Sequence, residues 1–364
     1  IYILMTIRDR YIRKTLLHFT FVVLVIWLGV YSFFNYLQEM ERIGELDYSS
    51  LEALKYIAFQ MPEVAYKHSS PIILLGCILG MGHLATTNQL IVMQASGSSI
   101  LKLTTITVRT ALFFIIIFII LGESIAPIVS SDAKKNRAQA LGQSYTSNTQ
   151  KGFWIRDGDN FINVKKNFDG KLFNDITIIE VNSSNKINSV VAAQEANFDN
   201  QVMKMKNSKI FSIDNLNSIN TISIKDRNSY DKNVSFDQDL IDSLKKDPED
   251  LTTFTIIKQI QFLSDNKLRS GIFQVELYKR IMRPFNLIAM ILLAMLFIFG
   301  STRDASLGRK IFFGVVISLS FEMLSRVGAA TSLSFNFNPL LSVVLPTIVV
   351  MLVGIILIFK KSTN

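Results

Sequence analysis

The fold is decided by residues 104–127, which read TTITVRTALFFIIIFIILGESIAP. This run is apolar for long enough to cross a hydrocarbon core of about 30 Å, which takes about 20 helical residues. A long polar segment follows it, where a short loop would be expected between two membrane helices. We therefore predict a membrane-spanning helix with an inserted domain directly after it.

Five further apolar runs of comparable length lie outward from this one. They fall near residues 14–37, 70–86, 281–300, 309–331 and 339–359. The chain has 364 residues, 49% of them hydrophobic, and a mean hydropathy of +0.32, which is too apolar for a soluble protein. The sequence predicts an α-helical membrane protein with six transmembrane helices, three in residues 1–137 and three in residues 271–364.

The insert, residues 138–270, has the pattern of a β domain. Two strand-like runs, 153–156 and 161–164, flank Asp157 and Gly158, and this dipeptide favours a tight hairpin because it tolerates positive φ. More strands are expected near residues 175–181, 187–198, 202–211 and 218–224, followed by a helix-like, polar stretch over 237–267. The insert is predicted to be all-β and jellyroll-like. It could brace the membrane part, or bind a partner through its interior or an open edge strand.

Basic residues predict the orientation of the chain. They cluster before the first span, between the fourth and fifth, and at the end: Arg8, Arg10, Arg13, Lys14; Arg303, Arg309, Lys310; Lys360, Lys361. Because Lys and Arg accumulate in cytoplasmic loops, both termini should be cytoplasmic and the insert outside. This bias accounts for part of the net charge of +9, so we expect no nucleic-acid binding.

A short helix is predicted over about residues 87–96, between the second and third spans. Thr86 and Gln89 fit a capping box at its start, and Gly97 suits its end. Four apolar residues in a row, 90–93, give it a hydrophobic surface on the cytoplasmic side. It is either an interfacial helix that packs on its own bundle or a docking element for another protein.

Motifs for catalysis and nucleotide binding are missing from the sequence. It contains no G-x-x-x-x-G-K-[ST] loop, no H-E-x-x-H, no Cys/His cluster and no G-x-S-x-G elbow. Cys77 is the sole cysteine, so the insert has no disulfide. We expect a protein that is not an enzyme, holds no cofactor or metal, and needs a separate motor for any ATP-driven work.

Ionisable residues at membrane depth are costly and deserve a functional hypothesis. Glu322 and Arg326 lie four positions apart in the fifth span, so they can pair with each other or line a cavity. Arg109 and Glu123 are expected to reach toward the two interfaces from opposite ends of the third span. At the outer surface, four basic residues could meet anionic headgroups or be solvated: Arg42, Lys134, Lys135 and Arg137.

Several motifs, in order along the chain, identify a family. They are DRYIRKT at 9–15, VMQASG at 92–97, GESIAP at 122–127, RAQA at 137–140, and FIFG at 297–300 with Arg303, Gly308 and Arg309. Over nearly its whole length the chain resembles the LptF/LptG family of lipopolysaccharide export permeases. The motif Gln-Ala-Ser-Gly favours the LptG branch over LptF.

The resemblance implies half of an ABC transporter in the bacterial inner membrane, with a periplasmic β-jellyroll between the third and fourth helices. The paired permease would be LptF, and a dimer of the ATPase LptB would bind ATP and Mg. Lipopolysaccharide, taken from the outer leaflet, would pass through the jellyrolls to LptC and the bridge protein LptA. LptB would dock on the coupling helix, formed by Asn88, Gln89, Leu90, Ile91, Val92, Met93, Gln94, Ala95, Ser96 and Gly97.

Two departures from the family pattern affect the site. Gln89 stands where family members usually place a glutamate, so the coupling contact should depend on shape and hydrogen bonds. The outer part of the first span, which is basic in relatives, has Arg42 as its one basic residue. The candidates for substrate contact are Arg42, Lys134, Arg137, Phe34, Glu322 and Arg326. An alternative is a membrane-anchored structural or sensory protein whose β domain binds a partner.

Overall fold

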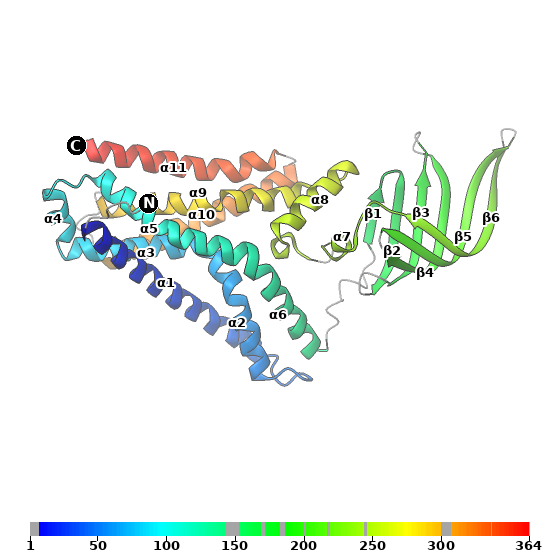
Figure 1. Ribbon diagram of the computed structural model, residues 1–364, viewed down its shortest axis with the longest axis horizontal. Helices are drawn as coiled ribbons and strands as arrows, with labels where there is room; N and C mark the ends of the chain where they lie inside the picture. The colour runs from blue at the N-terminus through cyan, green and yellow to red at the C-terminus, as the bar shows by residue number, and fades with distance from the viewer. Residues whose placement is uncertain are drawn as a thin grey trace. The chain divides into compact units, whose positions relative to one another are not determined.

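The computed structural model describes residues 7–142, 153–168, 172–182, 186–199, 201–216, 219–243, 246–299, 307–335 and 337–363. It divides into two compact units (Figure 1). We call Ile1–Arg137 together with Gln274–Asn364 the helical unit, and Ala138–Phe273 the β unit. Gly300 and Arg303, which carry part of the family motif, lie outside the described residues.

The helical unit is built from long apolar helices. Its elements are α1 (Ile7–Met40), α2 (Ser50–Lys67), α3 (Ser69–Thr86), α4 (Gln89–Ala95), α5 (Ile100–Ile120), the π-helical turn η1 (Leu121–Ile125), α6 (Ala126–Ala140), α9 (Gly271–Phe299), α10 (Leu307–Phe335) and α11 (Pro339–Thr363). Within the described residues, six stretches are long and apolar enough to cross a membrane: Ile7–Met40, Ser69–Thr86, Ile100–Ala140, Gly271–Phe299, Gly308–Phe335 and Pro339–Ser362. The prediction of six spans is confirmed.

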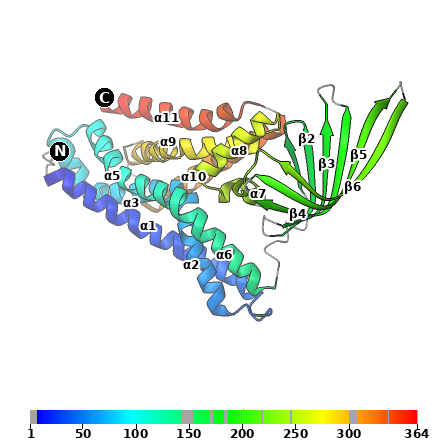
Figure 2. The ribbon, with the colours of Figure 1, turned by 45° about the vertical axis from the view of Figure 1, so that its right-hand side comes forward.

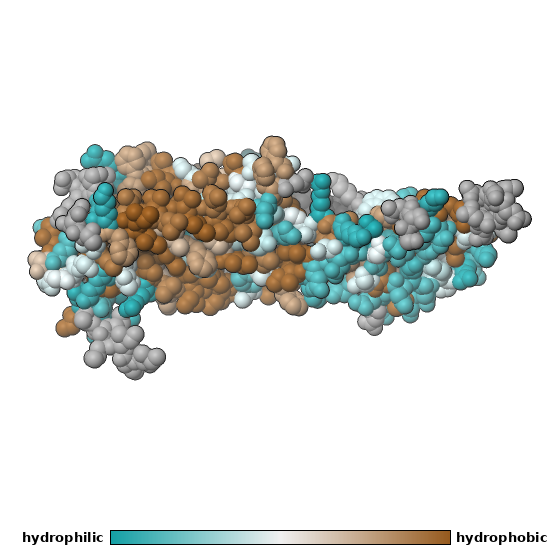
Figure 3. Space-filling view, turned by 90° about the horizontal axis from the view of Figure 1, so that it is seen from above, coloured by the Kyte–Doolittle hydropathy of each residue, from teal (hydrophilic) through white to brown (hydrophobic). Residues whose placement is uncertain are grey.

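Apolar side chains cover the outside of these helices as well as the inside. Figure 3 shows a broad hydrophobic surface over the helices, on the face that carries α11 in Figure 1. Helices that are apolar all round are typical of membrane spans, because the lipid tails take the place of a protein core.

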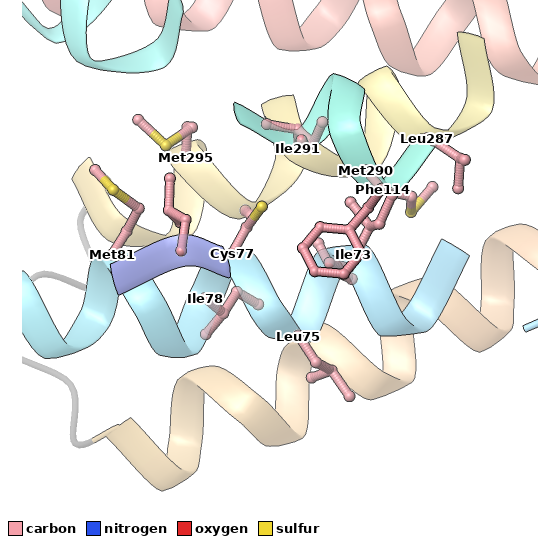
Figure 4. Close-up of a cluster of buried hydrophobic side chains, with 14 of the residues drawn as sticks. Ile73, Leu75, Cys77, Ile78, Met81, Phe114, Leu287, Met290, Ile291 and Met295 are labelled. Carbon is pink, nitrogen blue, oxygen red and sulfur yellow. The ribbon is translucent and has the colours of Figure 1, made fainter. Parts of the chain in front are cut away.

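Helix α3 is the centre of the helical unit. Its residues from Ser69 to Ile78 are all buried, and Cys77, Ile78 and Met81 contribute to one core with Phe114 of α5 (Figure 4). Met290, Ile291 and Met295 of α9 belong to the same core. Gly76 and Gly80 of α3 let α1 pack closely against it, since small residues let membrane helices approach.

Helix α2 was not predicted from the sequence, which reads there as an acidic loop after the first span. The side chain of Ser49 caps the helix by accepting a hydrogen bond from the backbone N–H of Glu52 (3.3 Å). A serine followed three positions later by a glutamate is a recognised helix start, so a signal was present.

The β unit contains β1 (Phe153–Asp157), β2 (Asn160–Phe168), β3 (Leu172–Val181), β4 (Ile187–Asp199), β5 (Val202–Leu216) and β6 (Ile219–Asn233). They form one antiparallel six-stranded sheet in sequence order. The predicted hairpin lies between β1 and β2, with Gly158 at φ +60°. Three short helical elements follow, α7 (Gln238–Ser243), η2 (Pro248–Asp250) and α8 (Thr253–Asp265). The prediction of an inserted β domain is confirmed.

This sheet is strongly bent (Figure 2), and side chains of strands that are not neighbours in the sheet meet. Lys232 at the end of β6 pairs with Glu180 of β3 (2.5 Å), and the backbone N–H of Ser235 donates to Asp157 (3.0 Å). The chain after β6 then places Phe236 against the apolar face of the sheet, stacked on Phe198. The strands follow one another as an antiparallel meander, bent over one apolar core.

Candidate functional site

Helix α4 follows α3 after only two linking residues, and its start differs from the predicted capping box. Asn88 is the N-cap residue, in the left-handed conformation at φ +59°, and no side chain caps the helix. The hydroxyls of Thr86 and Thr87 instead donate to the carbonyl of His83 (3.0 and 2.8 Å). The capping prediction was wrong because these threonines hydrogen bond back into the helix that precedes them.

The end of α4 is a Schellman motif. Gly97 has φ +86° and its N–H donates to the carbonyl of Gln94 (2.9 Å), while the N–H of Ser98 donates to Met93 (3.0 Å). These are the two hydrogen bonds that define the motif, and glycine fits because it lacks the Cβ that would be strained there. Gly97 therefore ends the helix as predicted.

The two faces of α4 are chemically different. Leu90 is 3% exposed and belongs to the core of the helical unit, and Met93 packs against that core. On the other side, Ile91 is 46% and Val92 is 66% exposed, and Ala95 and Ser96 are exposed beside them. We call these four residues, Ile91, Val92, Ala95 and Ser96, the outer face of α4.

Gln89 does not point its amide oxygen outward. Its Oε1 is buried and has no hydrogen-bond partner among the described residues. Leaving a buried carbonyl oxygen unpaired costs about 1–3 kcal/mol. The predicted hydrogen bond from Gln89 to a partner protein remains a prediction, and the outer face itself is apolar.

A second cluster lies where α1 ends. Glu39 is buried and accepts two hydrogen bonds from the guanidinium of Arg137 on α6 (2.8 and 2.9 Å) and one from the hydroxyl of Tyr48 (2.7 Å). Burial raises the pKa of Tyr48 well above its ordinary value, and the hydrogen bond to Glu39 and its charge raise it further. Tyr48 therefore stays protonated and remains a donor. The guanidinium also lies 5.0 Å from the ring centroid of Tyr56.

The other candidates near this end are differently placed. Lys134, on the same helix as Arg137, lies 4.0 Å from Glu63, which pairs more closely with Lys67 (2.7 Å). Burial alone would raise the pKa of Glu63, but these two lysines hold it below its ordinary value. Arg42 is half-buried in the turn after α1, and Phe34 is 58% exposed on α1. Their roles as substrate contacts stay predictions.

Glu322 and Arg326 pair along α10, with 2.8 Å between Arg326 Nη2 and Glu322 Oε1. The side chain of Arg326 is 70% exposed, so one acidic partner leaves most of the guanidinium accessible. Arg137 is therefore paired with a buried glutamate, whereas the guanidinium of Arg326 is largely accessible to a ligand.

An ionic network that we did not predict lies inside the helical unit. Arg280 of α9 is buried and donates to Glu123 in η1 (3.2 Å) and to Glu276 one turn earlier (3.2 Å). Glu123 also accepts a hydrogen bond from Tyr66 (3.3 Å). Glu123 thus pairs within the helical unit, and its expected reach to the interface stays a prediction. A glutamate in an apolar helix needs a cation, and the arginines at the start of the fourth span were the signal.

The described part of the chain contains no group of three or more histidine, cysteine or acidic side chains that could hold a metal. The arrangement suits recognition of a partner or ligand: it has an exposed apolar helix face and an accessible arginine, Arg326.

Six candidate spans with one β domain inserted between the third and fourth define a multi-pass membrane protein. Comparison with known families shows that the model of the lipopolysaccharide export system permease LptF/LptG matches residues 10–360. The chain therefore belongs to the LptF/LptG family, as its motifs predicted, and is an inner-membrane permease subunit of lipopolysaccharide export.

Two relatives illustrate the extent of the match. The lipopolysaccharide export system permease protein LptG of Escherichia coli (strain K12) is 25% identical over 354 residues, covering 97% of this chain and 98% of the relative. The protein of the same name from Haemophilus influenzae is 23% identical over 344 residues, covering 93% and 94%. The similarity extends through both units and through α4.

Proposed function

We propose that this chain is the LptG-type subunit of an ATP-driven transporter. It takes lipopolysaccharide from the outer leaflet of the inner membrane and passes it to a periplasmic bridge toward the outer membrane. Family membership supports the substrate. The observation that carries the ATP-driven part is the outer face of α4, where Ile91 and Val92 are exposed on a helix anchored from behind by Leu90.

The outer face of α4 docks the ATPase LptB, which supplies the ATP and Mg that this chain has no motif to bind. Exposed large apolar side chains of this kind mark protein contacts, and a few of them dominate the binding energy. Gln89 adds no charge to the contact, and its oxygen is turned inward. Docking here consequently depends on the fit of Val92 and Ile91 into an apolar pocket of the ATPase.

The substrate site is completed by the paired permease LptF. On this chain, the accessible cations for the phosphates of lipid A are Arg326 and Arg42, since guanidinium groups bind phosphate through two parallel hydrogen bonds. Arg137 and Lys134 contribute less directly because their side chains are only 18% and 31% exposed, against 70% for Arg326. Phe34 and its neighbour Phe33, both exposed, would face the acyl chains.

The β unit lies in the periplasm and both termini lie in the cytoplasm. Its bent sheet, with an apolar inner face, receives the lipid and passes it to LptC and LptA. The excess of basic residues at both ends of the chain supports this orientation.

Replacing Val92 tests the docking proposal. Val92→Asp puts a charge on the outer face, and LptB should bind at least about tenfold more weakly, a loss of about 1.4 kcal/mol. Co-purification of LptB and ATP-dependent lipopolysaccharide transfer in proteoliposomes are the measurements. Ile7→Asp, at an apolar side chain that is 89% exposed at the start of α1, is the matched control. Unchanged LptB binding by Val92→Asp would contradict the proposal.

A photo-crosslinking amino acid tests the substrate contacts. Placed at Arg42 or Arg326 in membranes that contain lipopolysaccharide, it should capture lipopolysaccharide, while the same group at Arg10 should not. Capture of ordinary phospholipid alone at both positions would rule out these contacts.

A further inference from the structure

Helices α1 and α3 are in backbone contact over one turn. A Cβ added to Gly76 of α3 would lie 2.7 Å from the Cα of Thr20, and one added to Gly80 would lie 3.3 Å from the Cα of Leu16. The two glycines are four positions apart, as are the two residues opposite them, so one face of each helix is involved. Such close approach of small residues is a strong form of helix association in membranes.

Contacts beyond this turn extend the junction in both directions. Toward the end of α3, the ring of His83 lies 5.3 Å from that of Phe19 on α1. At its start, the ring of His68 lies 5.6 Å from that of Trp27. Helix α1 is therefore held along the whole length of α3.

Arg8 joins α1 to the end of α4. Its Nη1 donates a hydrogen bond to the hydroxyl of Ser98, a residue 3% exposed. Its Nε and Nη2 both lie 3.2 Å from Asp9 Oδ1, which fixes the orientation of the guanidinium. Ser98 is also the residue whose N–H closes the Schellman motif of α4, so Arg8 holds the point at which that helix ends.

Buried apolar side chains also connect α1 to α4. Ile12 of α1 and Leu90 of α4 are both buried in the same apolar cluster, together with Leu84 at the end of α3. The three helices thus share a dry junction at the end of the bundle that carries α4.

We propose that Arg8 is a positioning residue that fastens α4 to α1, so that α1, α3 and α4 move as one rigid unit when a docked ATPase displaces α4. The inference rests on the proposed function. At a rise of about 1.5 Å per residue, the 34 residues of α1 span about 50 Å, so a small tilt at α4 becomes a larger displacement at the far end. Phe34 and Arg42 lie at that end, and the ATPase would thereby move the proposed substrate contacts.

The rest of α1 leaves room for such movement. Its side chains Phe21, Val25 and Ile26 are more than half exposed within the described structure. Apart from the face on α3, the helix thus presents a surface that lipid or a partner permease can follow.

The number of lipopolysaccharide molecules transferred per ATP hydrolysed tests the inference, in proteoliposomes that contain the complete complex. Arg8→Ala should lower this ratio at least fivefold while ATPase co-purification, ATP hydrolysis and thermal stability stay near the wild-type values. Arg8→Lys, which can still donate to Ser98, should recover part of the ratio. Arg10→Ala, at an exposed arginine two positions away, is the control and should match the wild type.

A second pair of variants tests the backbone contact. Gly76→Ala must push α1 away from α3 and should also lower the ratio, whereas Gly29→Ala, with no atom within 4 Å of the added methyl, should not. A wild-type ratio in both Arg8→Ala and Gly76→Ala would overturn the inference, as would loss of the ATPase from Arg8→Ala. Failure of the wild-type complex to bind an ATPase or transfer lipopolysaccharide would instead overturn the proposed function.

Discussion

Arg137 and Glu39 are bonded by two hydrogen bonds, 2.8 and 2.9 Å long, although 98 positions separate them in the chain. The pair joins α6 to the end of α1, and both side chains are largely removed from water. Glu39 is 11% and Arg137 is 18% exposed. Because each charge is largely removed from water, its lost hydration is offset mainly by its interaction with the other charge.

Removing one partner should therefore destabilise the protein markedly. Glu39→Ala leaves the guanidinium of Arg137 unpaired, and we expect a loss of about 3 kcal/mol in the free energy of unfolding. Unfolding in detergent micelles, followed by circular dichroism, measures it. Glu41→Ala, at an exposed carboxylate two positions away, should cost less than about 0.5 kcal/mol. The double variant Glu39→Ala/Arg137→Ala should lose less free energy of unfolding than the two single variants lose together. A loss equal to their sum would mean that the pair is not coupled.

Because α4 has one buried and one exposed face, substitutions at Leu90 and Val92 should affect different properties, stability and ATPase binding. Leu90→Ala empties part of the core and should lower stability by about 2–5 kcal/mol. Val92→Ala shortens an exposed side chain and should change stability by less than about 0.5 kcal/mol while weakening ATPase binding. Thermal unfolding and ATPase co-purification, measured on the same preparations, separate the two roles. The expectation fails if Val92→Ala binds the ATPase as the wild type does.

Much of this architecture could be predicted because its signals are long or local. A span needs about 20 apolar residues, which the run around Phe114 supplies without reference to any other part of the chain. The hairpin at Gly158 and the helix end at Gly97 depend on glycine at positive φ, a property of the single residue. Such features are visible in the sequence.

The missed features depend on partners far away in the chain. Nothing near Glu123 indicates that Arg280 neutralises it, since 157 positions separate them. Lys232 likewise meets Glu180 only because the sheet bends. At the candidate site, the sequence could not show which face of α4 is buried, because a helix of seven residues is too short for its periodicity to decide.

The ion pair between Glu180 and Lys232 predicts how the β unit responds to acid. Burial would raise the pKa of Glu180, but hydrogen bonds from Lys232 and Ser189 hold it below its ordinary value of about 4.3. A carboxylate whose pKa is lowered by folding stabilises the folded state above the unfolded pKa. That contribution, up to about 1 kcal/mol for a pair of this exposure, is lost as the pH falls through the folded-state pKa.

The fluorescence of Trp154 can be used to follow the unfolding of the β unit. The chain has two tryptophans, so in a Trp27→Phe background the emission of Trp154 reports on the β unit alone. Thermal unfolding followed by this signal should lose stability below about pH 4, and Glu180→Gln should show a smaller loss. Glu195→Gln, at an exposed carboxylate on β4, serves as the control. Identical pH profiles for Glu180→Gln and the parent would refute the assignment.

Gly122 makes the last prediction, because the ring of Tyr66 occupies the space where its side chain would be. A Cβ built on this residue overlaps the ring, and the ring is held by its hydroxyl on Glu123 and by Arg283, 4.7 Å from its centroid. Overpacking of this kind costs about 1–3 kcal/mol, and we expect that loss for Gly122→Ala in detergent unfolding. Gly29→Ala, which adds a methyl group in open space, should be close to neutral. In a Tyr66→Ala background, Gly122→Ala should cost nothing further, because the space is then empty. An undiminished cost in that background would show that the backbone of the π-helical turn, and not the ring of Tyr66, requires glycine.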